Sequence, residues 1–260
     1  KDALVQALIK ETGCPNVYER SDAAVRQREG LPLVTGVLAG AEPDPELSVT
    51  EHGVRYHVDV RNGHKTGFYV DQRDNRKLVG DLAEGREVLN CFCYTGGFSL
   101  AALRGGATSV TSIDSSGEAL KIAASNVTLN GFDPARATWL DADVFKTLRE
   151  FRAEGRQFDL IVLDPPKFAP SAQHIDRAAR AYKEINLVGM QLLRPGGLLF
   201  TYSCSGAISM ELFQKIVAGA ATDARSDARI LRRLSAGTDH PMSAAFPEGE
   251  YLKGLLLEKI

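Results

Sequence analysis

The sequence lacks any long hydrophobic run. No apolar stretch among its 260 residues approaches the roughly 18 residues that a membrane-spanning helix needs. It also lacks a recognisable signal peptide, an internal repeat and a low-complexity tract. We therefore expect a globular protein without a membrane partner. Because the sequence begins at Lys1 rather than Met, we also expect a further segment upstream.

Cysteine is scarce, and its spacing excludes the common metal-binding motifs. The four cysteines are Cys14, Cys91, Cys93 and Cys204. Their spacings fit no zinc pattern, and Cys91 and Cys93 are one residue too close for a Cys-x-x-Cys clip. We therefore expect no metal site, and reduced thiols in a cytoplasmic protein.

An excess of positive charge is also missing. The chain holds 31 Lys and Arg against 33 Asp and Glu, which gives a formal net charge of −2. Residues 1–66 hold 8 basic and 10 acidic side chains, and residues 67–260 hold 23 of each. A nucleic-acid partner would therefore have to be held by a local basic patch, or by a part of the protein outside this sequence.

Two patterns divide the chain near residue 66. Before it, a short amphipathic helix at 2–10 and two alternating strands within 47–60 predict a small α/β domain, residues 1–66. From about residue 86, apolar runs alternate with helical segments, which predicts a doubly wound α/β domain with a parallel sheet, residues 67–260. The expected strands are 88–92, 109–114, 137–140, 158–164 and 198–204, and the expected helices are 97–104, 116–130, 144–154 and 176–193.

Ligands of such sheets bind where the strands end, so the residues after each run are the candidates. After the first run, adjacent Gly96 and Gly97 let the backbone turn tightly and approach a ligand. The G-x-G-x-x-G spacing of a dinucleotide site is absent, and an ordinary strand–helix turn stays open as the alternative. Asp114 after the second run could accept from ribose hydroxyls or cap a helix. Together these features favour an adenosine ligand.

Acidic residues also follow the third run. Asp143 could accept a hydrogen bond from an adenine amino group, with Phe145 packed nearby, and we prefer it over Asp141. Either carboxylate could instead cap the next helix. The pair Ser115-Ser116 offers an N-cap for the helix expected at 116–130.

The fourth and fifth runs end in the most reactive side chains. Asp164 ends an apolar run and is followed by two prolines, which stiffen the turn. A structural turn explains the prolines, but not the carboxylate before them or the Lys-Phe pair after them. Cys204 after the fifth run is a candidate nucleophile, with a buried inert thiol as the alternative. Its pairing with Asp164 on a neighbouring strand favours the nucleophile.

Several blocks of sequence carry a resemblance that covers nearly the whole chain. The blocks are residues 18–22, 29–33, 63–76, 90–99, 158–168, 182–206, 239–241 and 247–254. In this order they resemble the RNA large-subunit methyltransferase I family, which makes 5-methylcytosine in 23S ribosomal RNA. The resemblance implies a seven-stranded class I (Rossmann-like) methyltransferase domain, preceded by the small α/β domain and by a PUA RNA-binding domain outside this sequence.

The resemblance also implies S-adenosylmethionine as cofactor and ribosomal RNA as partner. Cys204 matches the nucleophile of RNA cytosine-5 methyltransferases, and Asp164 is expected to be the second catalytic residue, at the N3 edge of the base. The residues expected at the methyl donor are Phe68, Asp71, Arg73, Asn90, Phe92, Tyr94, Gly96, Gly97, Phe98, Asp114, Ser115, Asp143, Asp164 and Pro165. Those expected at the RNA are Pro166, Lys167, Phe168 and His240.

Three other functions stay open at this point. An amino-group methyltransferase also uses an Asp-Pro-Pro turn, but its aromatic residue follows the prolines directly and it needs no cysteine. The others are a non-catalytic RNA-binding module and a small-molecule methyltransferase. The base that removes the carbon 5 proton is unassigned, and the oligomeric state is open, with a homodimer as one option.

Overall fold

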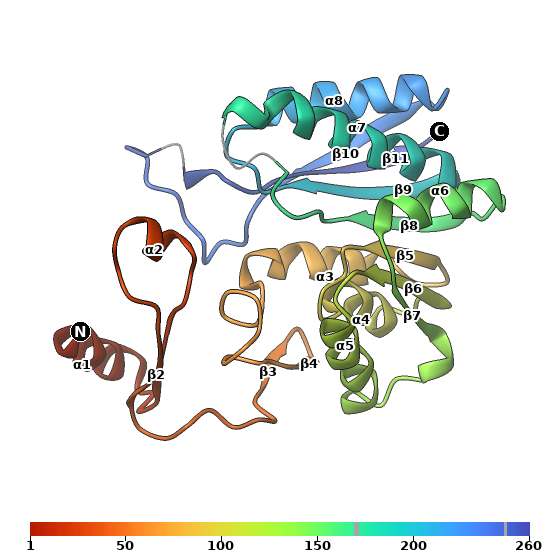
Figure 1. Cartoon of the computed structure of the whole chain (residues 1–260). Helices are drawn as coiled ribbons and strands as arrows, with labels where there is room; N and C mark the ends of the chain where they lie inside the picture. The colour runs from red at the N-terminus through yellow and green to blue at the C-terminus, as the bar shows by residue number, and fades with distance from the viewer. Residues whose placement is uncertain (169–171, 247–248) are drawn as a thin grey trace. The chain divides into compact units, whose positions relative to one another are not determined.

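The computed structural model describes residues 1–168, 172–246 and 249–260 (Figure 1). The described residues form two compact units. The first comprises residues 1–50 and 56–69, and the second comprises residues 51–55 and 70–260. The change at Tyr69 and Val70 lies three residues beyond the expected boundary, and the tip of a hairpin belongs to the second unit.

The first unit is small and mixed. Its strands β1 and β2 pair antiparallel, and buried Tyr56 packs against the ring of Phe68 at 4.9 Å between centroids. The predicted turn at His52 and Gly53 is present between β3 and β4, with positive φ at both residues. The elements up to this hairpin are α1 (Asp2–Thr12), β1 (Val17–Ser21), α2 (Val25–Arg28), β2 (Val34–Ala39), β3 (Ser48–Glu51) and β4 (Val54–His57).

The second unit contains the expected seven-stranded sheet, with the order β10-β11-β9-β8-β5-β6-β7. The five strands from β7 to β9 in this order run parallel, and β10 and β11 add an antiparallel edge (Figure 1). The doubly wound architecture is therefore confirmed. The strands are β5 (Glu87–Cys91), β6 (Ser109–Asp114), β7 (Ala137–Asp141), β8 (Phe158–Leu163), β9 (Leu193–Ser203), β10 (Ala228–Leu234) and β11 (Lys253–Lys259).

Helices cover both faces of this sheet. Figure 1 shows α3, α4 and α5 on one face and α6, α7 and α8 on the other. The predicted caps of α5 are present, because the Ser116 side chain accepts from Ala119 N and the helix ends at Asn130 before Gly131. The helices are α3 (Arg73–Asp81), α4 (Gly97–Arg104), α5 (Gly117–Leu129), α6 (Val144–Ala153), α7 (Ile175–Leu192) and α8 (Met210–Asp223), with short 3-10 turns at η1 (Val70–Gln72), η2 (Pro134–Arg136) and η3 (Ala172–His174).

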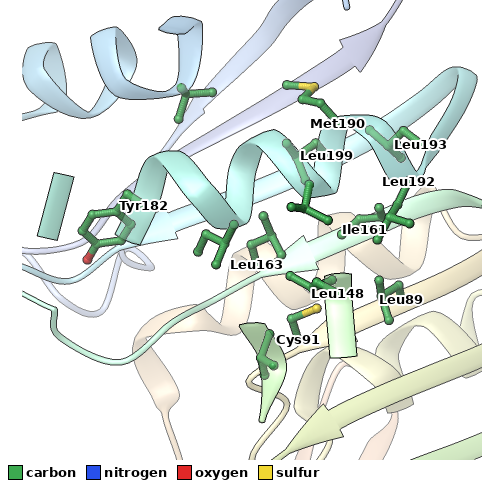
Figure 2. Packing of buried hydrophobic residues seen from close by; sticks show 14 of the residues in the cluster. Leu89, Cys91, Leu148, Ile161, Leu163, Tyr182, Met190, Leu192, Leu193 and Leu199 are labelled. Carbon is green, nitrogen blue, oxygen red and sulfur yellow. The ribbon is translucent and has the colours of Figure 1, made fainter. Parts of the chain in front are cut away.

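The hydrophobic core lies between the sheet and the layer of α6, α7 and α8 (Figure 2). Leu89, Ile161 and Leu199, from the adjacent strands β5, β8 and β9, are fully buried there. Burial on both faces explains why the central parts of these strands are mostly apolar and do not alternate with polar residues. The first polar residue after each run therefore lies at the rim of the core. None of the described helices is long and apolar enough to cross a membrane.

Candidate active site

The site lies where the parallel strands end, around the pair β5 and β8. The chain continues from β5 to β6 on one side and from β8 to β9 on the other, so the connections diverge at this pair. Open α/β sheets bind their ligands at such a switch point. The strand-end residues singled out in the sequence surround it.

The loop after β5 has an unusual backbone. Phe92, Tyr94 and Gly96 have φ values of 61°, 48° and 80°, all in the left-handed region. A non-glycine residue is rare there, and such conformations gather at functional sites. At Gly96 a Cβ would lie 2.9 Å from the ring of Trp139 and 3.0 Å from Ala123, so a side chain does not fit. The loop is therefore tightly packed, and it is its backbone that a ligand at the start of α4 would meet.

Asp114 fastens this loop to the end of β6. Its Oδ2 accepts from Tyr94 N at 2.8 Å and its Oδ1 from Ser116 N at 2.9 Å. Each carboxylate oxygen has a second lone pair, so Asp114 can also accept from a ribose hydroxyl while it keeps both bonds. The helix-cap alternative belongs to Ser116 instead, and neighbouring Ser115 is exposed.

Asp143 has the structural role that the sequence left open. It is the N-cap of α6, and its Oδ1 accepts from Lys146 N at 2.8 Å. The capping role is thus shown, and its contact with an adenine stays a prediction. Asp141, at the end of β7, is exposed as well.

Two of the expected donor-binding residues hold buried acceptors with no partner in the described parts of the chain. One is Asn90 Oδ1, whose own Nδ2 donates to Ser99 Oγ at 2.8 Å. The other is Asp71 Oδ1, while Asp71 Oδ2 accepts from Tyr251 Oη at 2.7 Å. An unsatisfied buried polar group costs about 1–3 kcal/mol. Both positions therefore suit a ligand that brings N–H or O–H donors.

Asp164 and Cys204 come from adjacent parallel strands. Leu163, the last residue of β8, is opposite Thr201 of β9, so both chains leave the sheet close together. Cys204 Sγ lies 4.0 Å from the carbonyl oxygen of Pro165, directly after Asp164. The thiol and the carboxylate are both half-buried. The structure thus places the thiol beside the Asp-Pro-Pro turn.

A buried hydroxyl network holds both neighbours of Cys204. Tyr182 Oη lies 3.0 Å from Ser203 Oγ, which donates to it, and 3.0 Å from Ser205 Oγ. All three side chains are fully buried. Burial raises the pKa of Tyr182, so its hydroxyl stays neutral at physiological pH. Because both flanking residues are fixed in this way, the backbone of Cys204 is also fixed.

The segment before β11 approaches the same place. Lys253, the first residue of β11, is 3% exposed, and its Nζ donates to Ser205 O at 2.8 Å and to Tyr251 O at 2.7 Å. Burial lowers the pKa of Lys253. Burial, together with the neighbouring Asp71, raises the pKa of Tyr251. This segment therefore links Asp71 to the neighbourhood of Cys204.

Arg73 and His240 meet through Asp239. Arg73 Nη1 donates to Asp239 Oδ2 at 3.0 Å, and His240 Nδ1 lies 3.2 Å from Asp239 Oδ1. The hydrogen bond with His240, aided by the charge of Arg73, lowers the pKa of Asp239. Gly237 N also donates to Asp71 O at 2.9 Å. The 237–240 turn is thus docked against the start of α3.

The remaining expected residues are more scattered. Phe68 belongs to the first unit, where it packs on Tyr56. Phe98 is 6% exposed and stacked on Tyr202, so it packs in the core. Phe168 is half-buried among aromatic rings, with Tyr182 at 4.9 Å between centroids. Phe168 also contacts the rings of Phe92 and Phe145, Pro165 is buried, and Gly97, Pro166 and Lys167 lie at or near the surface.

Sequence reasoning gave no role to Tyr182, Tyr251 or Lys253. Tyr182 fits the apolar face of α7, so its periodicity indicates a core residue and nothing more. Lys253 is the first residue of β11, and a lysine is mostly exposed unless it is paired. The available signal was a lysine directly before the apolar run of β11. The described residues contain no cluster of three or more side chains that could hold a metal ion.

Comparison with known proteins gives a consistent result. Residues 12–248 match a family model described as S-adenosylmethionine-dependent methyltransferase. A relative from Shewanella amazonensis, named Ribosomal RNA large subunit methyltransferase I, is 53% identical over 256 residues. The match covers 98% of this chain and 65% of the relative, so the chain spans about two thirds of the length of that protein.

Solved structures agree on the fold. A chain from Streptococcus mutans, described as a SAM-dependent methyltransferase, superimposes with a TM-score of 0.86 at 25% identity. Another, SMU.776, described as a methyltransferase complexed with SAH, gives the same TM-score and identity. Each match covers 99% of this chain and 65% of the solved chain.

Proposed function

The chain belongs to the family of S-adenosylmethionine-dependent methyltransferases, and from this membership we propose that it methylates carbon 5 of a cytosine in large-subunit ribosomal RNA through a covalent adduct with Cys204. The substrate follows the name of the 53% identical relative. The chemistry follows the position of Cys204 beside the Asp-Pro-Pro turn.

The residues at the switch point fit the methyl donor. The carboxylate of Asp114 would hold the ribose hydroxyls, and the buried acceptor Asp71 Oδ1 would hold the ammonium group of the methionine part. The tight loop at Gly96 would pack its backbone against the donor. When bound, S-adenosylmethionine supplies an electrophilic methyl group.

Cys204 and Asp164 would activate the cytosine base. Carbon 5 of cytosine is a weak nucleophile. When the Cys204 thiolate adds to carbon 6, carbon 5 becomes the nucleophilic carbon of an enamine. The new Sγ–C6 bond takes the thiolate electron pair, and a protonated Asp164 would hold the N3 edge on which negative charge develops. Once carbon 5 is methylated, loss of its proton restores the C5–C6 double bond and expels the thiolate. The target base must leave its stack to reach these groups.

The 4.0 Å between Cys204 Sγ and Pro165 O is the observation that supports this chemistry over amino-group methylation. An amino-group methyltransferase would use the carboxylate and the prolines of the turn without a thiol beside them. The location in the cytoplasm, the oligomeric state and a PUA domain outside this sequence stay predictions.

The test is to trap the adduct. We expect the wild-type chain to form a denaturant-stable adduct with large-subunit ribosomal RNA that contains 5-fluorocytosine, because fluorine cannot leave as a proton does. Cys204→Ala should lose both the adduct and methyl transfer, while Cys14→Ser, at an exposed thiol of the first unit, should keep both. Methyl transfer by Cys204→Ala at the wild-type rate would rule out the covalent mechanism.

A further inference from the structure

Lys253, the first residue of β11, is an almost completely buried lysine. Lysine is almost never fully buried unless it is paired, yet only 3% of Lys253 is exposed. Its position is set by the sheet, because Lys253 of β11 lies opposite Ser203, the last residue of β9. The next residue after Ser203 is Cys204. The sheet therefore places Lys253 beside the residue that precedes Cys204.

The hydrogen bonds of Lys253 leave one position of its amine for a third partner. Nζ donates to the carbonyl oxygens of Ser205 and Tyr251. Ser205 is the residue directly after Cys204. An ammonium group has three N–H donors, so two carbonyls satisfy only two of them. The charges that act on Lys253 are those of Cys204, Glu250 and Lys167. Of these, Cys204 is the half-buried group and Glu250 and Lys167 are exposed.

We propose that Lys253 is a positioning residue for Cys204, whose ammonium group holds the Ser205 carbonyl and stabilises the neighbouring thiolate. The inference rests on the proposed function, in which Cys204 must be a thiolate to attack carbon 6. A cation beside a cysteine favours the ionised form of the thiol. In a largely buried setting this attraction is only weakly screened by salt.

The other groups that face Cys204 do not supply this charge. They include Tyr182 of α7 and Tyr251 of the segment before β11, whose pKa values are both raised by burial, so that both are neutral. Asp164, in the turn beside Cys204, is a carboxylic acid and brings no positive charge. Around Lys253, Glu250 favours the ammonium form and Lys167 opposes it. The charge of Cys204 also acts to raise the pKa of Lys253, against the effect of burial.

The test measures the ionisation of Cys204 without any methyl transfer. The rate of iodoacetamide alkylation is followed against pH for each cysteine peptide by mass spectrometry. Exposed Cys14 is the internal comparison in the same sample. In the wild-type chain we expect Cys204 to have a lower apparent pKa than Cys14.

Two matched variants separate the effect of the positive charge of Lys253 from the effect of its hydrogen bonds to the two carbonyls. Lys253→Gln keeps two N–H donors for the carbonyls but removes the charge, and Lys253→Arg keeps the charge. We expect Lys253→Gln to raise the apparent pKa of Cys204 by about one unit, which is a tenfold loss of thiolate at neutral pH. Lys253→Arg should restore most of this loss, and Cys14 should not change.

Two results would overturn the proposal. One is a Cys204 profile that Lys253→Gln leaves unchanged. The other, which needs no variant to fold, is a wild-type Cys204 with an apparent pKa equal to or above that of Cys14. Because alkylation requires neither RNA nor methyl donor, a failure of the proposed function would leave this measurement intact. A shifted Cys204 without any adduct on RNA would refute the function and keep the role of Lys253.

Discussion

Adding one methyl group at Gly96 should destabilise both the fold and the proposed binding site of the methyl donor. The φ of 80° lies in the left-handed region, where an L-residue with a Cβ costs about 1–2 kcal/mol. The Cβ would also lie 2.9 Å from Trp139 and 3.0 Å from Ala123, and such overpacking costs about 1–3 kcal/mol. We therefore expect Gly96→Ala to lower the free energy of unfolding by about 2–5 kcal/mol.

Gly131→Ala is the matched control. Gly131 has a φ of 65°, but a Cβ there would meet no atom within 4 Å. Gly131→Ala should therefore lower the free energy of unfolding only by the cost of a left-handed backbone conformation, about 1–2 kcal/mol. Urea denaturation followed by circular dichroism gives both free energies. Trp139, the one tryptophan of the sequence, adds a fluorescence signal from a side chain next to Gly96.

The binding of SAH separates the local effect from the global one. The clash moves the loop that Asp114 holds, so we expect calorimetry to show at least a tenfold weaker affinity for Gly96→Ala under conditions where it is folded. Gly131→Ala should bind like the wild type. If Gly96→Ala matches Gly131→Ala in both stability and affinity, the packing argument for this loop is wrong.

Two further predictions concern ion pairs away from the reacting groups. Arg76 Nε and Nη2 donate to the two carboxylate oxygens of Glu51 at 2.7 and 2.6 Å, and both side chains are nearly buried. Arg76→Met should cost about 3–5 kcal/mol in urea denaturation because it leaves a buried carboxylate unpaired, and a loss under about 1 kcal/mol would contradict this. Burial acts to raise the pKa of Asp159, but the Glu87 N–H and Arg194 lower it below its usual value of 3.8. Its stabilising effect is therefore present above that pH and is lost as the pH falls through the folded pKa, so the acid unfolding curve of Asp159→Asn should be flatter than that of the wild type.

The parallel half of the sheet was predictable because its signals are local. Strand β8 is buried at every position except Asp159, and its apolar run Leu160–Leu163 ends at the polar Asp164. Strand β10 was missed because it is an exposed edge strand that carries three arginines among seven residues. These charged side chains interrupt the apolar run by which the other strands were recognised. Helix α3 was missed for a related reason, since its buried face includes Arg76 and Asn75.

The candidate site was predictable only where topology alone determines it. The rule that ligands bind at strand ends brought out Asp114, Asp164 and Cys204, because it needs no knowledge of side-chain contacts. Lys253 and Tyr251 were given no role because their partners lie 48 and 180 residues away in the sequence. The partners of Lys253 are also backbone carbonyls, which have no sequence signature.

The pairing of β9 with β11 has a consequence for the order in which the protein is made. When a ribosome has completed β9, the thiol of Cys204 already exists, but Lys253 is still 49 positions away in the sequence. Until β11 is synthesised and docks beside β9, Cys204 lacks the cation that would make it a strong nucleophile. A nascent or partly unfolded chain would thus carry an ordinary thiol, less prone to oxidation or misdirected attack. Because β11 is synthesised last, the Cys204 thiol would become reactive only when folding is complete.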